Sequence, residues 1–163
     1  MVSVNTHTYA VTYVTEKILK SLQYIITNSG LDPNKFVGNW SSYEVAVQTW
    51  LRSGHLKVVS LEIVSPAGSF LRRWDLEINY SYGGGDGTMW IDKEALKYAI
   101  SKFGVSPSAC TYNILIQNES GRPDVVGWGP GTYLSTEGFI KQSLGTAIGT
   151  GSIGAQATYW RPA

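Results

Sequence analysis

The last third of the chain reads GRPDVVGWGPGTYLSTEGFIKQSLGTAIGTGSIGAQATYWRPA, from Gly121 to Ala163. Nine of the protein's 18 glycines lie in this stretch, and from Val125 onward it contains only three charged residues. Flexible linkers carry little that is worth burying, whereas this stretch has five large aromatic residues: Trp128, Tyr133, Phe139, Tyr159 and Trp160. Because glycine adopts backbone conformations that other residues avoid, and aromatic rings gain by burial, we expect extended chain wrapped over a preformed core. A wrapped segment can also unwrap, and this is the main indication of function.

Length and charge restrict the class of protein. With 163 residues, 43% of them hydrophobic, the chain fits one globular domain. Its net charge of +1 comes from dispersed basic and acidic residues, so we expect no direct nucleic-acid binding and no membrane binding, and a protein partner instead. The single cysteine, Cys110, excludes an internal disulfide and is typical of a reducing cytoplasm. The chain has no signal-peptide pattern at its start and no apolar run of membrane-spanning length, so we expect a cytoplasmic protein.

The first half of the chain predicts two main helices. Apolar residues recur at helical spacing from Thr8 to Asn28, and Gly30 ends the run. Asp32-Pro33 is an N-cap followed by a proline, and it predicts a short turn that buries Phe36 and Trp40. Ser41 and Glu44 have the spacing of a capping box, which predicts a second main helix from there to Gly54.

The middle of the chain predicts a sheet and one more helix. Two strand-like runs, His55 to Val64 and Phe70 to Tyr82, flank a turn sequence and predict an antiparallel hairpin. After a loop at Gly83 to Gly87, Asp92 caps a third helix that ends at Gly104, and Thr111 to Gln117 is a further strand. The fold class is therefore α+β, with three main helices packed on one face of a small antiparallel sheet.

Catalytic motifs are weak. Gly149-x-Gly151-x-x-Gly154 matches the dinucleotide fingerprint in letters only, because no strand and helix surround it. Asp75 and Glu77 alternate on a strand as metal-binding carboxylates do, yet solvated carboxylates on an exposed sheet face are the favoured interpretation. One cysteine and two isolated histidines give no zinc-site spacing. We expect no enzyme activity, no metal and no cofactor.

The remaining signal is a strand followed by a wrapped tail. If the edge of the strand Thr111 to Gln117 is open, its unpaired amides and carbonyls can accept an extended peptide, and a tail folding across would trap it. The alternative is a tail that permanently supplies more strands to the sheet. Composition alone does not separate the two.

Short segments in a fixed order along nearly the whole chain carry a family resemblance. They are Tyr13-Val14-Thr15, Ile18 to Leu22, Gly30 to Pro33, Arg73-Trp74-Asp75, Leu96 to Ile100, Gly121 to Asp124, Gly127-Trp128, Lys141 to Gly145 and Tyr159-Trp160-Arg161. In this order they resemble a HORMA domain. Specifically, the chain resembles the small bacterial HORMA proteins found beside cGAS/DncV-like nucleotidyltransferases in anti-phage CBASS operons.

The resemblance implies a non-catalytic signalling adaptor and conformational switch. In this family a C-terminal safety belt wraps a closure peptide, and the closed form binds and activates a cGAS/DncV-like nucleotidyltransferase that makes a cyclic nucleotide second messenger. A TRIP-like AAA+ ATPase reopens the domain by engaging its N-terminus. Carried over by region, residues 1–120 are the HORMA core and residues 121–163 are the belt of the same single domain.

The resemblance also places the site residues by region. The peptide would add beside Thr111, Tyr112, Asn113, Ile114, Leu115, Ile116 and Gln117. The handle for the ATPase would be the polar start of the chain, Met1 to Thr6, with Val2, Ser3, Val4, Asn5 and Thr6. We expect Trp128, Tyr133 and Trp160 to anchor the belt over the core, because buried rings hold an extended segment in place.

Overall fold

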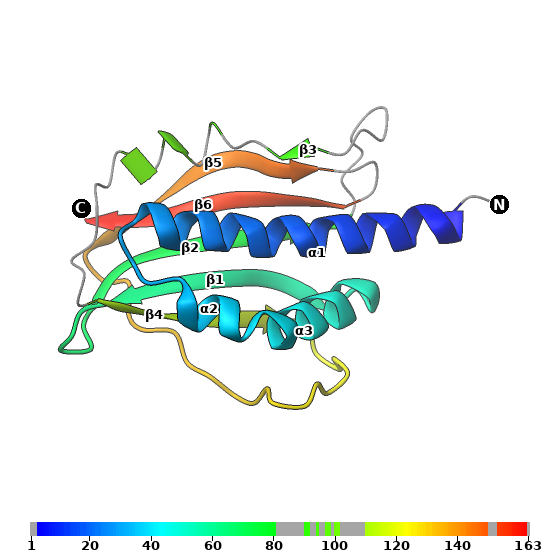
Figure 1. Cartoon of the computed structure of the whole chain (residues 1–163), viewed down its shortest axis with the longest axis horizontal. Coiled ribbons are helices and arrows are strands. Elements are labelled where there is room, and N and C mark those ends of the chain that lie inside the picture. The colour runs from blue at the N-terminus through cyan, green and yellow to red at the C-terminus, as the bar shows by residue number, and fades with distance from the viewer. Residues whose placement is uncertain are drawn as a thin grey trace.

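A computed structural model describes residues 3–80, 90–91, 94, 97–98, 100–101, 110–149 and 153–162. The described strands form one sheet in the order β3-β5-β6-β2-β1-β4, and every neighbouring pair is antiparallel. Helices α1, α2 and α3 lie on one face of this sheet (Figure 1). The predicted α+β class is confirmed.

The first helix, α1, spans Ser3–Asn28 and crosses the sheet. The predicted apolar stripe is buried, including Val11, Val14 and Ile18, because these positions recur on one helical face. The helix begins five residues before the predicted start at Thr8. Ser3 to Thr6 therefore belong to α1. The handle prediction had assumed that they form a separate polar segment before the helix, and this assumption is wrong.

The short helix α2 spans Asn34–Gly38, and α3 spans Trp40–Arg52. Pro33, one residue after the predicted Asp32, occupies the cap position of α2, while Asp32 Oδ1 accepts a hydrogen bond from the Asn34 amide (2.9 Å). Phe36 is fully buried, and Trp40 is half-buried edge-on against it, with ring centroids 5.6 Å apart.

The predicted capping box at Ser41 and Glu44 is wrong. The helix starts at Trp40, and Asn39 occupies the cap position without a side-chain hydrogen bond. The Tyr43 amide donates to the Asn39 carbonyl (3.2 Å), which places Ser41 inside the first turn. Packing of Trp40 on Phe36 favours this earlier start over the local capping signal.

The predicted hairpin is confirmed as β1, Leu56–Val64, and β2, Phe70–Asn79. Its turn places Gly68 at φ 85°, a conformation that favours glycine. Val59, Leu61 and Ile63 of β1 face the helices and are buried. The alternating residues of β1 and β2 therefore point to the opposite face of the sheet.

The rest of the sheet comes from the second half of the chain. The predicted strand is confirmed as β4, Thr111–Asn118, which pairs with β1 at one edge of the sheet. Strands β5, Phe139–Gly149, and β6, Gly154–Pro162, form a hairpin, and β6 pairs with β2. Two-residue β3, Trp90–Ile91, pairs with β5. Gly149 and Gly154, which match the dinucleotide fingerprint, pair with each other across the β5–β6 hairpin.

Two predicted elements fall largely outside the described residues. These are the loop at Gly83 to Gly87 and the helix from Asp92 to Gly104, of which the described residues 94, 97, 98, 100 and 101 are helical. Within the described part of the chain, no helix combines the length and the apolar character needed to cross a membrane.

Candidate functional site

Strand β4 ends the sheet of the described residues on one side, and among these residues its outer edge has no backbone partner. The Glu119 amide donates to the His55 carbonyl (2.7 Å), so the odd-numbered residues before it turn their amides and carbonyls toward β1. Lys35 Nζ reaches the Tyr112 carbonyl (3.0 Å) from outside the sheet, which fits the same alternation. Tyr112, Ile114 and Ile116 therefore direct their backbone groups to the open edge.

Residues 119–138, here called the crossing segment, connect β4 to β5 and pass beside this edge (Figure 1). Among the described residues, no backbone hydrogen bond joins the crossing segment to β4. The edge is thus covered by chain that does not pair with it. This is the arrangement that can admit another extended strand.

The first half of the crossing segment is fixed on the helical layer. Trp50 Nε1 of α3 donates to the Pro123 carbonyl (2.7 Å), and the Arg122 guanidinium lies 4.8 Å from the centre of the Trp50 ring. Trp128, a predicted anchor, is half-buried and edge-on to Trp50 (5.8 Å) and Tyr43 (6.0 Å). Aromatic contacts of this kind stabilise by about 0.5–1.5 kcal/mol each beyond their buried area.

The second half is fixed on the opposite face of the sheet. The Tyr133 hydroxyl lies 3.0 Å from Ser60 Oγ, and the Leu134 amide donates to Glu62 Oε2 (2.9 Å). Ser60 and Glu62 alternate with the helix-facing residues of β1, so their side chains point away from the helices. Burial, and the nearby Asp75 carboxylate, raise the pKa of Tyr133 above its usual value, which keeps this hydroxyl protonated. The crossing segment therefore wraps around the β4 edge from one face of the sheet to the other.

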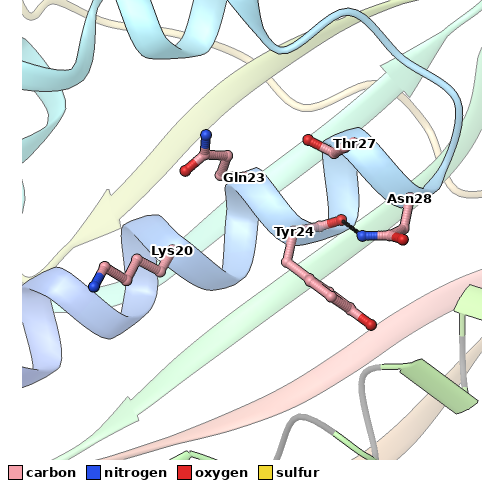
Figure 2. Close-up of a pocket in the computed structure, with 5 residues that line it drawn as sticks. All are labelled: Lys20, Gln23, Tyr24, Thr27 and Asn28. Carbon is pink, nitrogen blue, oxygen red and sulfur yellow. Dashed lines mark hydrogen bonds between the residues drawn. The ribbon is translucent and has the colours of Figure 1, made fainter.

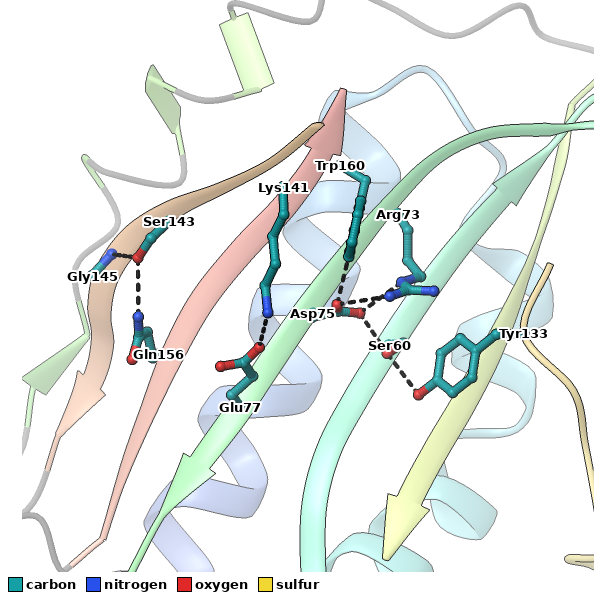
Figure 3. A network of polar contacts seen from close by, with 10 residues as sticks. All are labelled: Ser60, Arg73, Asp75, Glu77, Tyr133, Lys141, Ser143, Gly145, Gln156 and Trp160. Carbon is teal, nitrogen blue, oxygen red and sulfur yellow. Dashed lines mark hydrogen bonds and ion pairs between the residues drawn. The ribbon is translucent and has the colours of Figure 1, made fainter. Parts of the chain in front are cut away.

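A buried carboxylate connects this wrap to the C-terminal hairpin. Asp75 accepts hydrogen bonds from Ser60 Oγ (2.6 Å), Trp160 Nε1 (3.0 Å) and Arg73 Nη2 (3.3 Å), as Figure 3 shows. The Arg73 side chain pairs with Asp75 and lies against the rings of Tyr133 (4.6 Å) and Trp160 (4.9 Å). Through Ser60 and Asp75 the network joins Tyr133 to Trp160 across three strands.

The interpretation of Asp75 as a solvated carboxylate is therefore wrong. Asp75 is only 4% exposed, because Tyr133 and Trp160 cover its face of the sheet. Glu77 is more exposed and pairs with Lys141 (2.8 Å). Within the described part of the chain, no group of three or more His, Cys, Asp or Glu side chains is placed to hold a metal ion.

The three predicted anchors do not form one group. Trp128 and Tyr133 lie on the crossing segment, on opposite faces of the sheet, whereas Trp160 is part of β6. Sequence reasoning missed Ser60, Glu62 and Trp50 as the partners of the segment. Their only sequence signal was polarity at alternate positions of β1, which an exposed strand face shows as well.

Between β4 and the crossing segment lies a cavity of about 240 Å³. Most of its lining side chains are apolar, although the lining surface as a whole is almost evenly polar and apolar. The lining comes from both sides: Ile114, Leu115, Ile116, Trp128, Gly129, Pro130, Gly131 and Tyr133. The segment lies close to β4 at Gly131, where a Cβ atom would come within 3.2 Å of Leu115 Cδ2. The structure thus brings three residues of the predicted peptide strand and two predicted anchors to one cavity.

A second hollow, of about 250 Å³, lies on the surface of α1. Its lining residues all belong to this one helix, as Figure 2 shows: Lys20, Gln23, Tyr24, Thr27 and Asn28. Asn28 Nδ2 donates to the Tyr24 carbonyl (2.8 Å), and Lys20 pairs with Glu16 (2.6 Å). These partners are local to the helix, so the hollow supplies no convergent chemistry.

A model of the family described as Bacterial HORMA domain 2 matches the chain over residues 1–163. The chain belongs to the bacterial HORMA domain family. The family resemblance seen in the sequence is confirmed. No curated protein matches this HORMA protein in sequence.

Solved structures share the fold of this HORMA protein at low sequence identity. A chain of the mitotic checkpoint complex is similar with a TM-score of 0.72 and 12% identity, covering 94% of this chain and 99% of that one. The E. coli MS115-1 CdnC:HORMA-deltaN complex is similar with a TM-score of 0.61 and 12% identity, and the match covers 94% of this chain and 87% of that one. C. elegans HTP-2 bound to the HIM-3 closure motif is similar with a TM-score of 0.54 and 14% identity, and the match covers 74% of this chain and 68% of that one.

We predict that the Asp75 network stabilises the wrapped arrangement. Asp75→Asn leaves the Arg73 guanidinium, whose side chain is 13% exposed, without its counter-charge. Breaking a buried pair in this way should lower the free energy of unfolding by about 2–4 kcal/mol, measured by urea denaturation. Glu77→Gln is the matched control, since its pair with Lys141 is more exposed and should cost less than about 1 kcal/mol. Equal effects of the two variants would contradict this role for Asp75.

Proposed function

We propose that this HORMA protein is a non-catalytic adaptor that binds an extended peptide between β4 and the crossing segment. The observation that carries the proposal is the outer edge of β4, whose backbone groups have no partner in the crossing segment that encloses it. The apolar cavity at the same place supports it. HTP-2, with the same fold, is bound to a closure motif in its solved structure.

The peptide would bind as an added strand. The free amides and carbonyls of Ile114 and Ile116 offer backbone hydrogen bonds, which supply affinity without reading sequence. The Tyr112 carbonyl already accepts from Lys35, so pairing would concentrate on the later part of β4. Side chains of the peptide would alternate between the two faces, where the cavity lining selects apolar groups.

Wrapping makes the site a conformational switch. The crossing segment is held on both faces of the sheet, so a peptide enters freely only when one set of anchors is released. The contacts of Tyr133 and Leu134 are few and are the simplest to break. Converting a mostly open population into a mostly closed one needs about 5.5 kcal/mol of differential binding, which several backbone hydrogen bonds and buried apolar side chains can supply.

The partner of the closed form would be a cGAS/DncV-like nucleotidyltransferase. In the proposed CBASS anti-phage system this enzyme makes the cyclic nucleotide second messenger, and the HORMA protein activates it without chemistry of its own. Membership of the bacterial HORMA family supports this, together with the fold shared with the CdnC:HORMA-deltaN complex. The assignment of residues 121–163 as the safety belt, and a cytoplasmic location, belong to the same proposal.

Reopening would be driven by a TRIP-like AAA+ ATPase acting on Met1 to Thr6. Because α1 begins at Ser3, the enzyme would have to unwind the first turn of this helix before pulling. The N-terminus lies at the far end of α1, well away from the C-terminus (Figure 1). Force applied there would reach the β5–β6 hairpin through α1, which packs on the sheet.

A permanently docked tail is the alternative. One observation favours it for part of the tail: β6 lies between β5 and β2, and pairs with β2 from Arg73 to Asn79. In this alternative the protein is a constitutive interaction subunit, and its crossing segment does not respond to a peptide.

We predict that backbone methylation of a bound peptide reveals strand addition. Peptides would be selected on the wild-type protein from a random 12-residue library and then N-methylated one residue at a time. Methyl groups on alternate residues should weaken binding about tenfold each, because those amides face β4, while the intervening positions change little. Isothermal titration calorimetry provides the affinities. A cost without alternation would exclude the added-strand mode.

Deletion of residues 1–6 tests the handle. The deletion removes about one turn of a 26-residue helix, so peptide affinity should stay within about twofold of wild type. Opening of the peptide complex by a TRIP-like ATPase with ATP, followed by release of a fluorescent peptide, should be abolished. Continued release from the truncated protein would show that the enzyme engages another part of the chain.

A further inference from the structure

Two tryptophans that touch each other, Trp50 and the cavity-lining Trp128, differ in their hydrogen bonding. Trp50 Nε1 donates to the Pro123 carbonyl at 2.7 Å. Trp128 Nε1 is also buried, yet no described residue accepts a hydrogen bond from it. Buried donors in folded proteins nearly always have a partner, so an orphan of this kind calls for an explanation. Trp128 lines the cavity, and its enclosed N–H would gain an acceptor from a peptide over which the crossing segment has opened and closed again.

We propose that the indole N–H of Trp128 is a specificity-determining donor that binds a backbone carbonyl of the peptide. This inference rests on the proposed peptide binding at β4, and it names a residue that recognises the bound peptide. A strand added to β4 turns one row of its carbonyls toward Ile114 and Ile116, and the other row toward the crossing segment.

The crossing segment offers few donors to that second row. Along the cavity its backbone runs through Gly129, Pro130 and Gly131, and proline has no N–H. Trp128, next to this stretch, presents the unpartnered N–H. A side-chain donor here compensates for the amide that Pro130 lacks.

The same geometry defines the class of ligand. The cavity is lined by Ile114, Ile116 and the Trp128 ring, and no charged side chain contributes to its lining. The ligand is therefore an extended peptide with an uncharged apolar residue beside the carbonyl that Trp128 binds. A charged residue at that position would lose its hydration without gaining a partner.

The test compares Trp128→Phe with Trp50→Phe, since both changes keep an aromatic ring, make the same reduction in ring size and remove one indole N–H. The probes are peptides selected on the wild type from a random 12-residue library. Trp128→Phe removes ring contacts but no hydrogen bond of the free protein, so it should lower the melting temperature less than Trp50→Phe does, and it should weaken peptide binding about tenfold. Trp50→Phe should lower the melting temperature more, because it removes the hydrogen bond to the Pro123 carbonyl and shrinks a ring that is only 1% exposed.

A double-mutant cycle separates the hydrogen bond from the change in ring size. Replacing a single peptide amide by an ester removes one N–H and weakens its carbonyl as an acceptor, and only the weakened carbonyl should couple to the Trp128 donor. One ester should weaken binding to the wild type and have several-fold less effect on Trp128→Phe, and this coupling identifies the carbonyl.

Each remaining outcome decides against a specific claim. If wild type and Trp128→Phe bind the peptides equally, or no ester shows coupling, the donor role is wrong and peptide binding stands. If Trp128→Phe lowers the melting temperature as much as Trp50→Phe, the N–H has a partner in the free protein and the inference fails. If no library peptide binds the wild type, the proposed function itself is wrong, and the donor role falls with it.

Discussion

The carboxylate of Asp75 holds together parts of the chain that are distant in sequence. It accepts from Ser60 of β1, Arg73 of β2 and Trp160 of β6, and Ser60 in turn contacts Tyr133 of the crossing segment. A buried charge is stable only when it is paired and hydrogen-bonded, so these groups must come together or the carboxylate must return to water. The docked hairpin and the wrapped segment therefore favour one another.

The two halves of the crossing segment are held by different kinds of contact. On the helical layer, the segment is held by the Trp50 hydrogen bond and by aromatic packing of Trp128 on α3. On the opposite face, it is held by hydrogen bonds at Tyr133 and Leu134 and by the Arg73 guanidinium against the Tyr133 ring, over the Asp75 network. Polar contacts exchange readily with water when a segment lifts, whereas buried rings do not. Opening is therefore expected to begin on the Tyr133 side.

Much of the fold could be predicted because its signals are local. The turn after Val64, the strand-like run of β1 and the helical stripe of α1 each depend on neighbouring residues, and all three appear as expected. The capping box at Ser41 failed because a packing contact, Trp40 on Phe36, decided where the helix begins. Local sequence allows several start positions for a helix, and tertiary packing determines which one is used.

The site was less accessible to sequence reasoning. Strand period correctly placed Asp75 on the face away from the helices, but it cannot tell what later covers that face. The two residues that cover this face are distant in sequence: Tyr133 lies 58 positions and Trp160 lies 85 positions after Asp75. From the sequence, an open edge at β4 could be stated only as an assumption, because the strand that pairs with each edge depends on the order of strands in the whole sheet.

The central claim is that the crossing segment closes over a peptide paired with the open edge of β4. Residue-resolved amide hydrogen exchange by NMR, with and without a selected peptide, tests this most directly. In the free protein the Leu115 amide, which faces β1, should exchange slowly, and those of Ile114 and Ile116 should exchange much faster. Added peptide should slow exchange at Ile114, at Ile116 and along the crossing segment. Equal protection of Ile114, Leu115 and Ile116 in the free protein, unchanged by peptide, would contradict the account.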